Sequence, residues 1–533
     1  MMNELHWSID AFVVRDNIFF SYGWLFIENQ PIRSVSVVCD GQQVALDYGK
    51  PRRDVEHAYP GQANAVYSGF LGYGSFNSPT QAAFVLSVVL EGGRQLDLAI
   101  PTKLIMDMDG STRRIKQTAL RQWAVLLQRA MRLLWIGQWR QVREKITRYI
   151  RGYPLHSIQF DSLAADLGLN GNLDTILIVD HDLGGGANQY RHEQVGQYRA
   201  QNRTVLILSY HLPTLNYVLT AETPTVSLRR SVQDLPFLYQ ALQSIKISEI
   251  IYNTAVSFAQ PEQIPNFLVS LARSKNAKLK TLVHDYYMIC PSHFLIGLEN
   301  FYCGIPSPDI CDHCLKKNSH GFTSLFTQAD IRLWRSLWGE MLEFSDEIVI
   351  FSQTILSILL RAYPHLEQTK VICRPHSIAY FRSQPIRVIQ TDPLCIGVVG
   401  RIGVHKGAEI IQALSELIVH RGLAIQIRII GTLELPCNPN VVQQTGSYEH
   451  DQLPSLIERS GVNMMLFPSI YPETFSYVVH ELMAMDLPIA AFNIGAPAEK
   501  LRHYAHGLLL FSRQPEDILA DLIQFHHVLL HKV

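Results

Sequence analysis

Short apolar runs in the last two-thirds of the chain constrain its fold more than any other feature. After Asn172, runs rich in β-branched residues alternate with stretches of helical character. These runs lie at 176–179, 205–208, 249–252, 281–283 and 348–351. Strands that are buried on both faces are apolar throughout, whereas a strand with one face in water alternates. The runs therefore predict a parallel sheet covered by helices on both faces.

A second series of apolar runs follows a less regular stretch near 378–392. Its members lie at 395–399, 425–430, 464–467 and 488–492. We interpret the two series as two Rossmann-like, doubly wound α/β sheets that are joined by a short linker and face a cleft. Ligands of open α/β sheets bind beyond the carboxyl ends of the strands, so we expect the chemistry in that cleft.

The residues before this region predict two further parts, as expected for 533 residues, which are too many for one core. Residues 34–37 alternate in polarity, and 83–90 and 96–100 flank a glycine turn, which indicates a β-hairpin. We expect Trp24, Phe26 and Phe70 in the core of this β-domain. The predicted domains are a β-sandwich at 1–105, a helical connector at 106–171, an N-terminal α/β domain at 172–385 and a C-terminal α/β domain at 386–533.

The connector carries a strongly basic segment at 113–151. Its apolar residues recur at helical spacing. The segment contains many arginines and lysines but only one acidic residue, Glu144, and its tryptophans are Trp123, Trp135 and Trp139. A basic amphipathic helix with tryptophans suits an anionic membrane surface. The alternative is a linker helix that packs on the rest of the chain with its basic side in water.

Composition narrows the class of protein. The formal net charge is -1, whereas a dedicated nucleic-acid binder carries a large positive excess, so we expect no nucleic-acid partner. The first ten residues lack the pattern of a signal peptide, and no apolar run approaches the ~20 residues that span a bilayer. We therefore expect a cytoplasmic protein, with membrane contact, on the inner face of the plasma membrane, only at its surface.

Two acidic residues in the second sheet give the sharpest signal for a site. Glu473 and Glu481 are eight positions apart, in a segment that follows the run at 464–467 and leads into an apolar helix. We expect Glu473 at the helix entrance, beside the free backbone N–H groups of Thr474, Phe475 and Ser476. Such an entrance suits phosphate oxygens, and a carboxylate there can grip sugar hydroxyls.

A glycine-rich loop with two cations follows the run at 395–399. It reads Gly400-Arg401-Ile402-Gly403-Val404-His405-Lys406-Gly407. The guanidinium of Arg401 offers a fork of donors and Lys406 a point charge, so together they can clamp a diphosphate. Charge that develops on a departing diphosphate is then met by fixed positive groups instead of a metal.

Taken together, these motifs resemble the donor site of the retaining group 1 (family 4) glycosyltransferases of the GT-B fold, of the bacterial polysaccharide-biosynthesis type. The likeness covers roughly 172–525 and includes the turn at 494–499. It implies that Arg401 and Lys406 bind the diphosphate of a nucleotide sugar, Glu473 the transferred sugar and Glu481 the ribose. Gly400 belongs to the same donor loop, and Tyr448 falls where such enzymes meet the base. No cofactor is implied for catalysis, and the acceptor is a glycan or a lipid-linked glycan.

Two motifs of the first sheet extend the resemblance. Gly184, Gly185 and Gly186 follow the opening run and resemble the family's acceptor or phosphate loop, although Asn188 stands where relatives often have Glu. Glycines also simply make tight turns. His284 follows the run at 281–283 and resembles a family histidine near the reaction centre, the alternative being a structural histidine. The Asp-x-Asp strings at 107–109 and 180–182 lack a metal-site context.

The cysteines Cys290, Cys303, Cys311 and Cys314 form a C-x12-C-x7-C-x2-C pattern. In a reducing compartment disulfides are rare, so a structural zinc site is one interpretation and buried free thiols are the other. A similar pattern occurs in a bacterial subgroup that this segment resembles.

The predicted function is transfer of a sugar from a nucleotide-diphosphate donor. Two alternatives remain open at this point: a nucleotide-sugar epimerase on the same fold, and a non-catalytic scaffold of a polysaccharide assembly complex.

Overall fold

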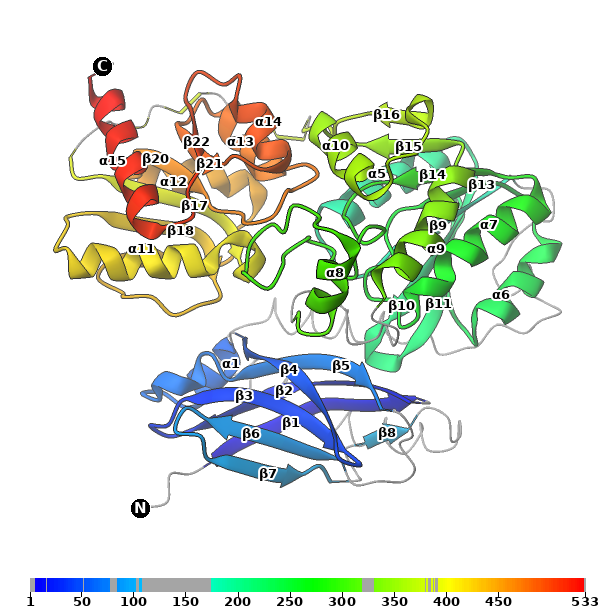
Figure 1. Cartoon of the computed structure of the whole chain (residues 1–533), viewed down its shortest axis with the longest axis horizontal. Helices are drawn as coiled ribbons and strands as arrows, with labels where there is room; N and C mark the ends of the chain where they lie inside the picture. The colour runs from blue at the N-terminus through cyan, green and yellow to red at the C-terminus, as the bar shows by residue number, and fades with distance from the viewer. Residues whose placement is uncertain are drawn as a thin grey trace. The chain divides into compact units, whose positions relative to one another are not determined.

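A computed structural model describes most of the chain outside the predicted connector (Figure 1). The described residues are 5–15, 17–50, 52–76, 84–101, 105–107, 174–318, 330–378, 380–381, 385–386, 388 and 392–531. The basic segment at 113–151 and Asp109 lie outside them. The chain forms two compact units, one of Met1–Asp182, Gln194–Ser248 and Ser257–Gln260, and another of Leu183–Glu193, Glu249–Val256 and Pro261–Val533. Within the described ranges, no helix has the length and apolar character that crossing a membrane requires.

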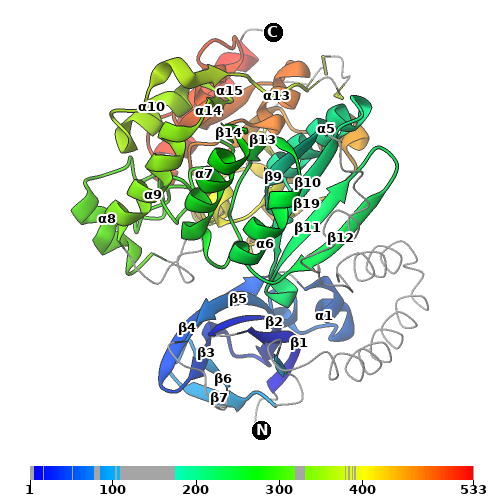
Figure 2. The same cartoon turned by 90° about the vertical axis from the view of Figure 1, so that its right-hand side faces the viewer.

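The N-terminal part is built from β-strands. They are β1 (Leu5–Arg15), β2 (Ile18–Ile27), β3 (Ile32–Cys39), β4 (Gln42–Lys50), β5 (Gly69–Ser75), β6 (Val85–Leu90), β7 (Gln95–Ala99) and β8 (Ile105–Asp107), with the short helix α1 (Arg53–Ala58) between β4 and β5. Hydrogen bonds join them in the order β7-β6-β3-β4-β5-β2-β1-β8, as one curved sheet (Figure 2). The predicted hairpin is present as β6 and β7, while the sandwich of two separate sheets stays a prediction.

The aromatic residues that we expected in the core of this part belong to two separate apolar clusters. Phe12, Val37 and Leu86 are fully buried in the same cluster as Phe70. Trp24 and Phe26 instead pack with Val55 of α1. Side chains at 24 and 26 share one face of β2, and α1 offers that face an apolar surface of its own. Phe26 is thus fully buried as predicted, in a second apolar cluster, whereas Trp24 is only partly buried against that cluster.

The predicted first series of strands is present in an eight-stranded α/β sheet. Its strands are β9 (Thr175–Val179), β10 (Thr204–His211), β11 (Asn216–Glu222), β12 (Ser227–Val232), β13 (Ile247–Tyr252), β14 (Lys278–Leu282), β15 (Glu347–Ile350) and β16 (Val371–Cys373), in the order β12-β11-β10-β9-β13-β14-β15-β16. Its helices are α5 (Gly186–Ala200), α6 (Leu235–Ala241), α7 (Ile264–Lys275), α8 (Pro308–Leu315), α9 (Ile331–Phe344) and α10 (Gln353–Ala362). β13 to β16 run parallel, whereas β11 and β12 form an antiparallel edge that the apolar runs did not reveal.

The second series forms a six-stranded parallel sheet. Its strands are β17 (Cys395–Ile402), β18 (Gln426–Leu433), β19 (Val442–Gln444), β20 (Met464–Phe467), β21 (Ile489–Phe492) and β22 (Gly507–Leu510), in the order β19-β18-β17-β20-β21-β22. The chain winds outward in one direction from β17 and then in the other from β20. The sheet therefore changes winding direction between β17 and β20, and such a switch point is where open α/β sheets bind ligands.

Helices cover both faces of this sheet, as continuous apolarity predicts (Figure 1). Ile396 and Val398 of β17 pack in one cluster with α11 (Ala408–His420) and α15 (Pro515–Leu530). Cys395 and Val399 point to the other face, toward α12 (Leu453–Ser460), α13 (Tyr477–Ala484) and α14 (Gly495–Leu501). Alternate residues of one strand thus serve two cores, which fixes the register of the loop that follows it.

Candidate active site

Two loops meet at the switch point of the six-stranded sheet. One follows β17 and contains a short 3-10 turn, η9 (Val404–Lys406), and the other follows β20. Gly407, at a φ of 83°, lies so close to the second loop that a Cβ would be 2.1 Å from the carbonyl oxygen of Pro468. Gly495, at a φ of 64°, would place a Cβ 2.6 Å from the Cα of Pro472. Glycine at both positions is what allows the two loops and the start of α14 to approach one another.

Glu473 and Lys406 lie on these two loops and influence each other. Glu473 is only 5% exposed. Burial raises the pKa of its carboxyl group, and the positive charge of Lys406 opposes that rise. Its Oε1 atom makes no hydrogen bond with the part of the chain that the structure describes. Hydrogen bonds from the side chains of Ser476, Ser469 and Tyr471 also hold the pKa of this carboxyl group down, so polar groups surround the oxygen that a hydroxyl group of a bound molecule would meet.

The backbone around Glu473 is held on both sides. Its N–H donates to the carbonyl of Tyr471 at 2.9 Å, and its own carbonyl accepts from Ala496 N at 2.9 Å. The helix α13 begins only at Tyr477, where the side chain of Ser476 accepts a hydrogen bond from Val479 N. Glu473 was expected at the entrance of this helix, and it lies three residues before the capping residue Ser476, in the segment that leads into α13.

Arg401 makes an ion pair that the sequence analysis missed. Its Nη2 is 3.3 Å from Oε1 of Glu434, and its side chain is 74% exposed. Glu434 directly follows β18, which runs parallel to β17 with Ile402 opposite Leu433. A search for acids after the neighbouring strand would have found it. The predicted cations therefore stand in different electrostatic surroundings, Arg401 beside an acid at the surface and Lys406 beside a buried one.

Glu481 lies about one helical turn into α13 and is 1% exposed. The hydroxyl of Tyr380 donates a hydrogen bond to its Oε1, and Nδ1 of His450 is 3.6 Å from the same atom. Burial, and then the negative charge of Glu481, raise the pKa of Tyr448 to about 12. The structure thus brings the predicted Glu481 and Tyr448 together and adds Tyr380 and His450 to them.

The glycine loop of the eight-stranded sheet is also close to α13. Gly184 and Gly185 adopt φ angles of 87° and 86°, and a Cβ on Gly186 would be 2.9 Å from the ring of Tyr477. The side chain of Asn188 accepts a hydrogen bond from Gly184 N at 2.6 Å. Asn188 therefore fixes the loop from within, which is a structural reason for an amide at this position.

His284 belongs to a cluster of aromatic rings. The cluster comprises Tyr190, His284, Phe351, His376, Phe475 and Tyr477. His284 stacks on Phe351 at 4.4 Å and lies 5.3 Å from His376. Burial lowers the pKa of His376 to about 3, with a smaller effect from His480, so its ring is neutral at physiological pH. Sequence reasoning identified neither His376 nor Tyr190 as part of a site.

The strand ends explain how this cluster forms. His284 follows β14, Phe351 follows β15 and His376 follows β16 by one to three residues. These three strands are parallel neighbours, so their carboxyl ends carry the three rings side by side. The predicted placement of His284 at the carboxyl edge of the sheet is therefore what the structure shows.

The four cysteines do not form a metal site. Within the described ranges, no three His, Cys, Asp or Glu side chains are placed to share an ion. Cys311 Sγ lies 3.6 Å from Nη2 of Arg335, and Cys314 Sγ accepts a hydrogen bond from Asn318. Burial raises the pKa of Cys303 and Cys311 above the ordinary value of a thiol. The prediction of a structural zinc ion is therefore not supported.

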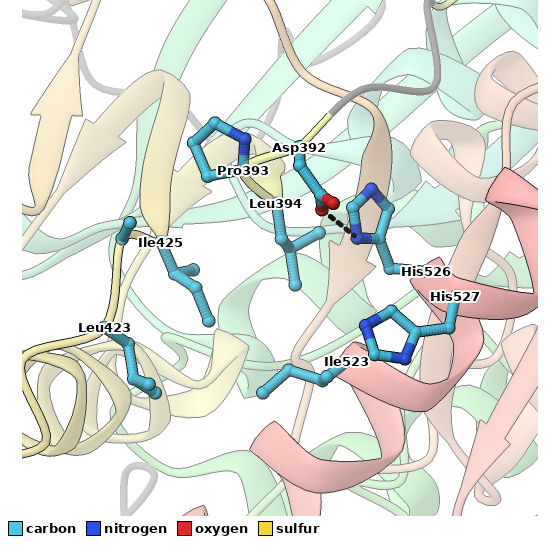
Figure 3. A pocket seen from close by; sticks show the side chains of 9 residues that line it. Asp392, Pro393, Leu394, Leu423, Ile425, Ile523, His526 and His527 are labelled. Atoms are coloured by element: carbon cyan, nitrogen blue, oxygen red, sulfur yellow. Dashed lines mark ion pairs between the residues drawn. The ribbon is translucent and has the colours of Figure 1, made fainter.

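A hollow of about 440 Å³ lies beside the amino ends of two strands of the six-stranded sheet (Figure 3). It is lined mainly by apolar side chains. Polar residues also line it, and Nδ1 of His526 is 3.8 Å from Oδ1 of Asp392. The lining residues Leu394 and Ile425 precede β17 and β18, so the hollow opens at the amino ends of these strands. It is thus at the opposite end of the strands from the loops that carry Lys406 and Glu473.

The sequence of the six-stranded region matches the profile of a known family. Residues 381–527 match the profile of the glycosyl transferases group 1. This likeness covers residues 381–527 and not the whole chain, and we call this region the glycosyltransferase domain. Arg401, Lys406, Glu473 and Glu481 all lie within it, and the predicted glycosyltransferase class of enzyme is confirmed at this level. The retaining mechanism, family 4 and a bacterial origin stay predictions.

Several solved structures show a weaker likeness to the chain that carries this glycosyltransferase domain. Anabaena HepE in complex with UDP-glucose is 14% identical, with 66% of this chain and 89% of that chain covered and a TM-score of 0.42. Sucrose-phosphate synthase from Thermosynechococcus elongatus is 16% identical, with 66% and 89% covered and a TM-score of 0.43. The lipopolysaccharide outer core galactosyltransferase WaaB is 11% identical, with 67% and 90% covered and a TM-score of 0.42. No curated protein sequence matches the chain.

Proposed function

We propose that the chain is a retaining GT-B glycosyltransferase that moves a hexose from a nucleoside-diphosphate sugar to a glycan or lipid-linked acceptor. The observation that carries this proposal is the buried Glu473 beside Lys406 at the switch point of the group 1 domain. A carboxylate oxygen with no donor of its own among the described residues, next to a fixed cation, suits a ligand that combines hydroxyl groups with negative charge.

Each part of the donor has a proposed set of partners. Lys406 and Arg401 bind the diphosphate, with Glu434 orienting the Arg401 guanidinium. Glu473 accepts hydrogen bonds from hydroxyls of the sugar. Glu481 binds the ribose, and Tyr448 and Gly400 contribute to the nucleotide site. The N–H groups of 474–476 add donors near the sugar, and the loop at 184–186 serves the acceptor or a phosphate.

The proposed reaction keeps the configuration at the anomeric carbon. The bond between that carbon and the diphosphate oxygen breaks, and an acceptor hydroxyl forms a new bond on the same face. The acceptor proton passes to an oxygen of the departing diphosphate, whose charge Lys406 and Arg401 stabilise. In this scheme no protein carboxylate acts as nucleophile, and His284 shapes the sugar site.

The setting of the reaction also belongs to the proposal. We infer a cytoplasmic enzyme of bacterial cell-surface polysaccharide synthesis, whose predicted segment at 113–151 contacts an anionic membrane surface. Catalysis uses no cofactor, and the predicted cleft between the two α/β sheets holds the donor.

A donor screen tests the proposal. UDP, GDP and dTDP sugars are added separately, and thermal unfolding of the full chain is followed. A ligand at about 100 times its dissociation constant stabilises the folded protein by about 2.7 kcal/mol, so a true donor raises the melting temperature clearly. Transfer of labelled sugar to a glycan fraction would then confirm the activity. Isomerised free donor would indicate an epimerase, and no response to any nucleoside diphosphate would indicate a scaffold.

A further inference from the structure

The segment 291–302 joins the eight-stranded sheet to the core of the six-stranded sheet. It follows β14 in the chain, yet Ile296 is 1% exposed within the apolar cluster that β17, α11 and α15 build. Phe294 and Phe301 pack against the same cluster. The N–H of Tyr302 donates to the carbonyl of Ile470 at 3.0 Å, which ties the segment to the loop after β20.

The ring of Phe294 contacts both loops of the candidate active site. It stacks on His405 with a centroid distance of 4.4 Å and an angle of 3°, and it lies 4.6 Å from the ring of Tyr471. His405 directly precedes Lys406, and Tyr471 lies two residues before Glu473. The two loops also meet each other, because Ile470 N donates to the carbonyl of His405 at 3.3 Å.

These contacts place the Phe294 side chain next to both the loop that carries Lys406 and the loop that carries Glu473. Nearly parallel stacking leaves the His405 ring little freedom to tilt, and the Tyr471 contact limits the second loop in the same way. The position of the Lys406 ammonium relative to the Glu473 carboxylate therefore depends on a residue that precedes the glycosyltransferase domain by more than eighty positions in sequence.

We propose that Phe294 is a positioning residue, which sets the separation of the Lys406 and Glu473 loops that a nucleoside-diphosphate sugar requires. The inference rests on the proposed function for the identity of the ligand, but its structural part does not. Misplacement of groups by about 1 Å can cost on the order of 100-fold in rate, so loss of the ring should be visible in catalysis.

The first test needs no ligand. Amide hydrogen exchange is compared between the wild-type full chain and the variants Phe294→Ala, Phe294→Tyr and Glu299→Gln. Glu299 lies on the same segment but pairs with Arg513 at the surface, so it is a matched control. We expect faster exchange at 401–407 and 469–474 in Phe294→Ala alone. Unchanged exchange in both loops would overturn the proposal.

The second test measures the donor site. Affinity for the nucleoside diphosphate that stabilises the wild type, and the kcat and KM for its sugar, are determined for the same variants. We expect Phe294→Ala to lower kcat/KM by about 10- to 100-fold and Phe294→Tyr to restore it, with Glu299→Gln near wild type. Wild-type kinetics in a folded Phe294→Ala would refute the positioning role. If Phe294→Ala does not fold, Phe294→Leu with an unchanged melting temperature takes its place.

The two tests separate the failure of the inference from that of the proposed function. A wild-type chain that binds no nucleoside diphosphate contradicts the proposed function, whatever the exchange experiment shows. A wild-type chain that binds and transfers, with Phe294→Ala indistinguishable from it, contradicts only the role of Phe294.

Discussion

The hydroxyl of Thr474 donates a hydrogen bond to the backbone carbonyl of His284 at 2.8 Å. One partner precedes α13 of the glycosyltransferase domain, and the other follows β14 of the eight-stranded sheet. The bond therefore connects the residue next to Glu473 with the aromatic cluster around His284. It gives the first prediction a well-defined pair of atoms.

Thr474→Val removes this donor while keeping the shape of the side chain. Thr474 is buried, so loss of its hydrogen bond to the His284 carbonyl should cost about 0.5–1.5 kcal/mol in the free energy of unfolding. Urea unfolding measures the effect. Thr474→Ser keeps the hydroxyl and should recover most of the loss, and equal stability of the valine variant and the wild type would contradict the prediction.

Lys406→Ala should abolish most of the transfer activity without unfolding the protein. Loss of one fixed group that stabilises developing negative charge typically lowers kcat by about 100- to 1,000-fold. The measurement is kcat with the identified donor, beside the melting temperature. Lys278→Ala is the matched control, because Lys278 is exposed at the amino end of β14. Near-normal turnover of Lys406→Ala would rule out the diphosphate clamp.

Glu473→Gln should separate stability from ligand binding. Burial raises the pKa of this carboxyl, so the folded protein holds the proton to a higher pH than the unfolded chain does. Its contribution to stability is then lost as pH rises through the raised pKa. At neutral pH the glutamine variant should be at least as stable as the wild type, yet lose the thermal stabilisation by the donor. Urea midpoints between pH 5 and 8 test this, with the exposed Glu458→Gln as control. A variant that is clearly less stable at neutral pH would speak against it.

His376→Phe should make the protein less sensitive to acid. The folded state lowers the pKa of His376 to about 3, so the unfolded chain binds a proton between that value and the ordinary histidine pKa of about 6.5. Stability associated with the neutral ring is full above this window and is lost as pH falls through it. Phenylalanine keeps the stack on Phe351 but cannot titrate. The fall in unfolding free energy from pH 7 to 4.5 should be smaller than in wild type, and the exposed His420→Phe should leave it unchanged.

Much of the fold was predictable because its signals are local. Each apolar run of the two series became a strand, since burial on both faces of a parallel sheet demands continuous apolarity. The hairpin of β6 and β7 was predictable from its glycine turn. The antiparallel strand β11 and the edge strand β12 were not among the predicted runs, and the conformation of 113–151 remains a prediction.

The candidate site was likewise predictable where its signals are local and not where they depend on tertiary contacts. The sequence by itself determined the loops after β17 and β20, with Lys406 on one and Glu473 on the other, because strand ends and glycines are visible in short stretches. Only the tertiary structure decided that Glu434 pairs with Arg401, that Arg335 contacts Cys311, and that Phe294 stacks on His405. Such contacts join residues tens to more than a hundred positions apart. They depend on how packed sheets bring distant loops together, and that information is absent from any local pattern of residues.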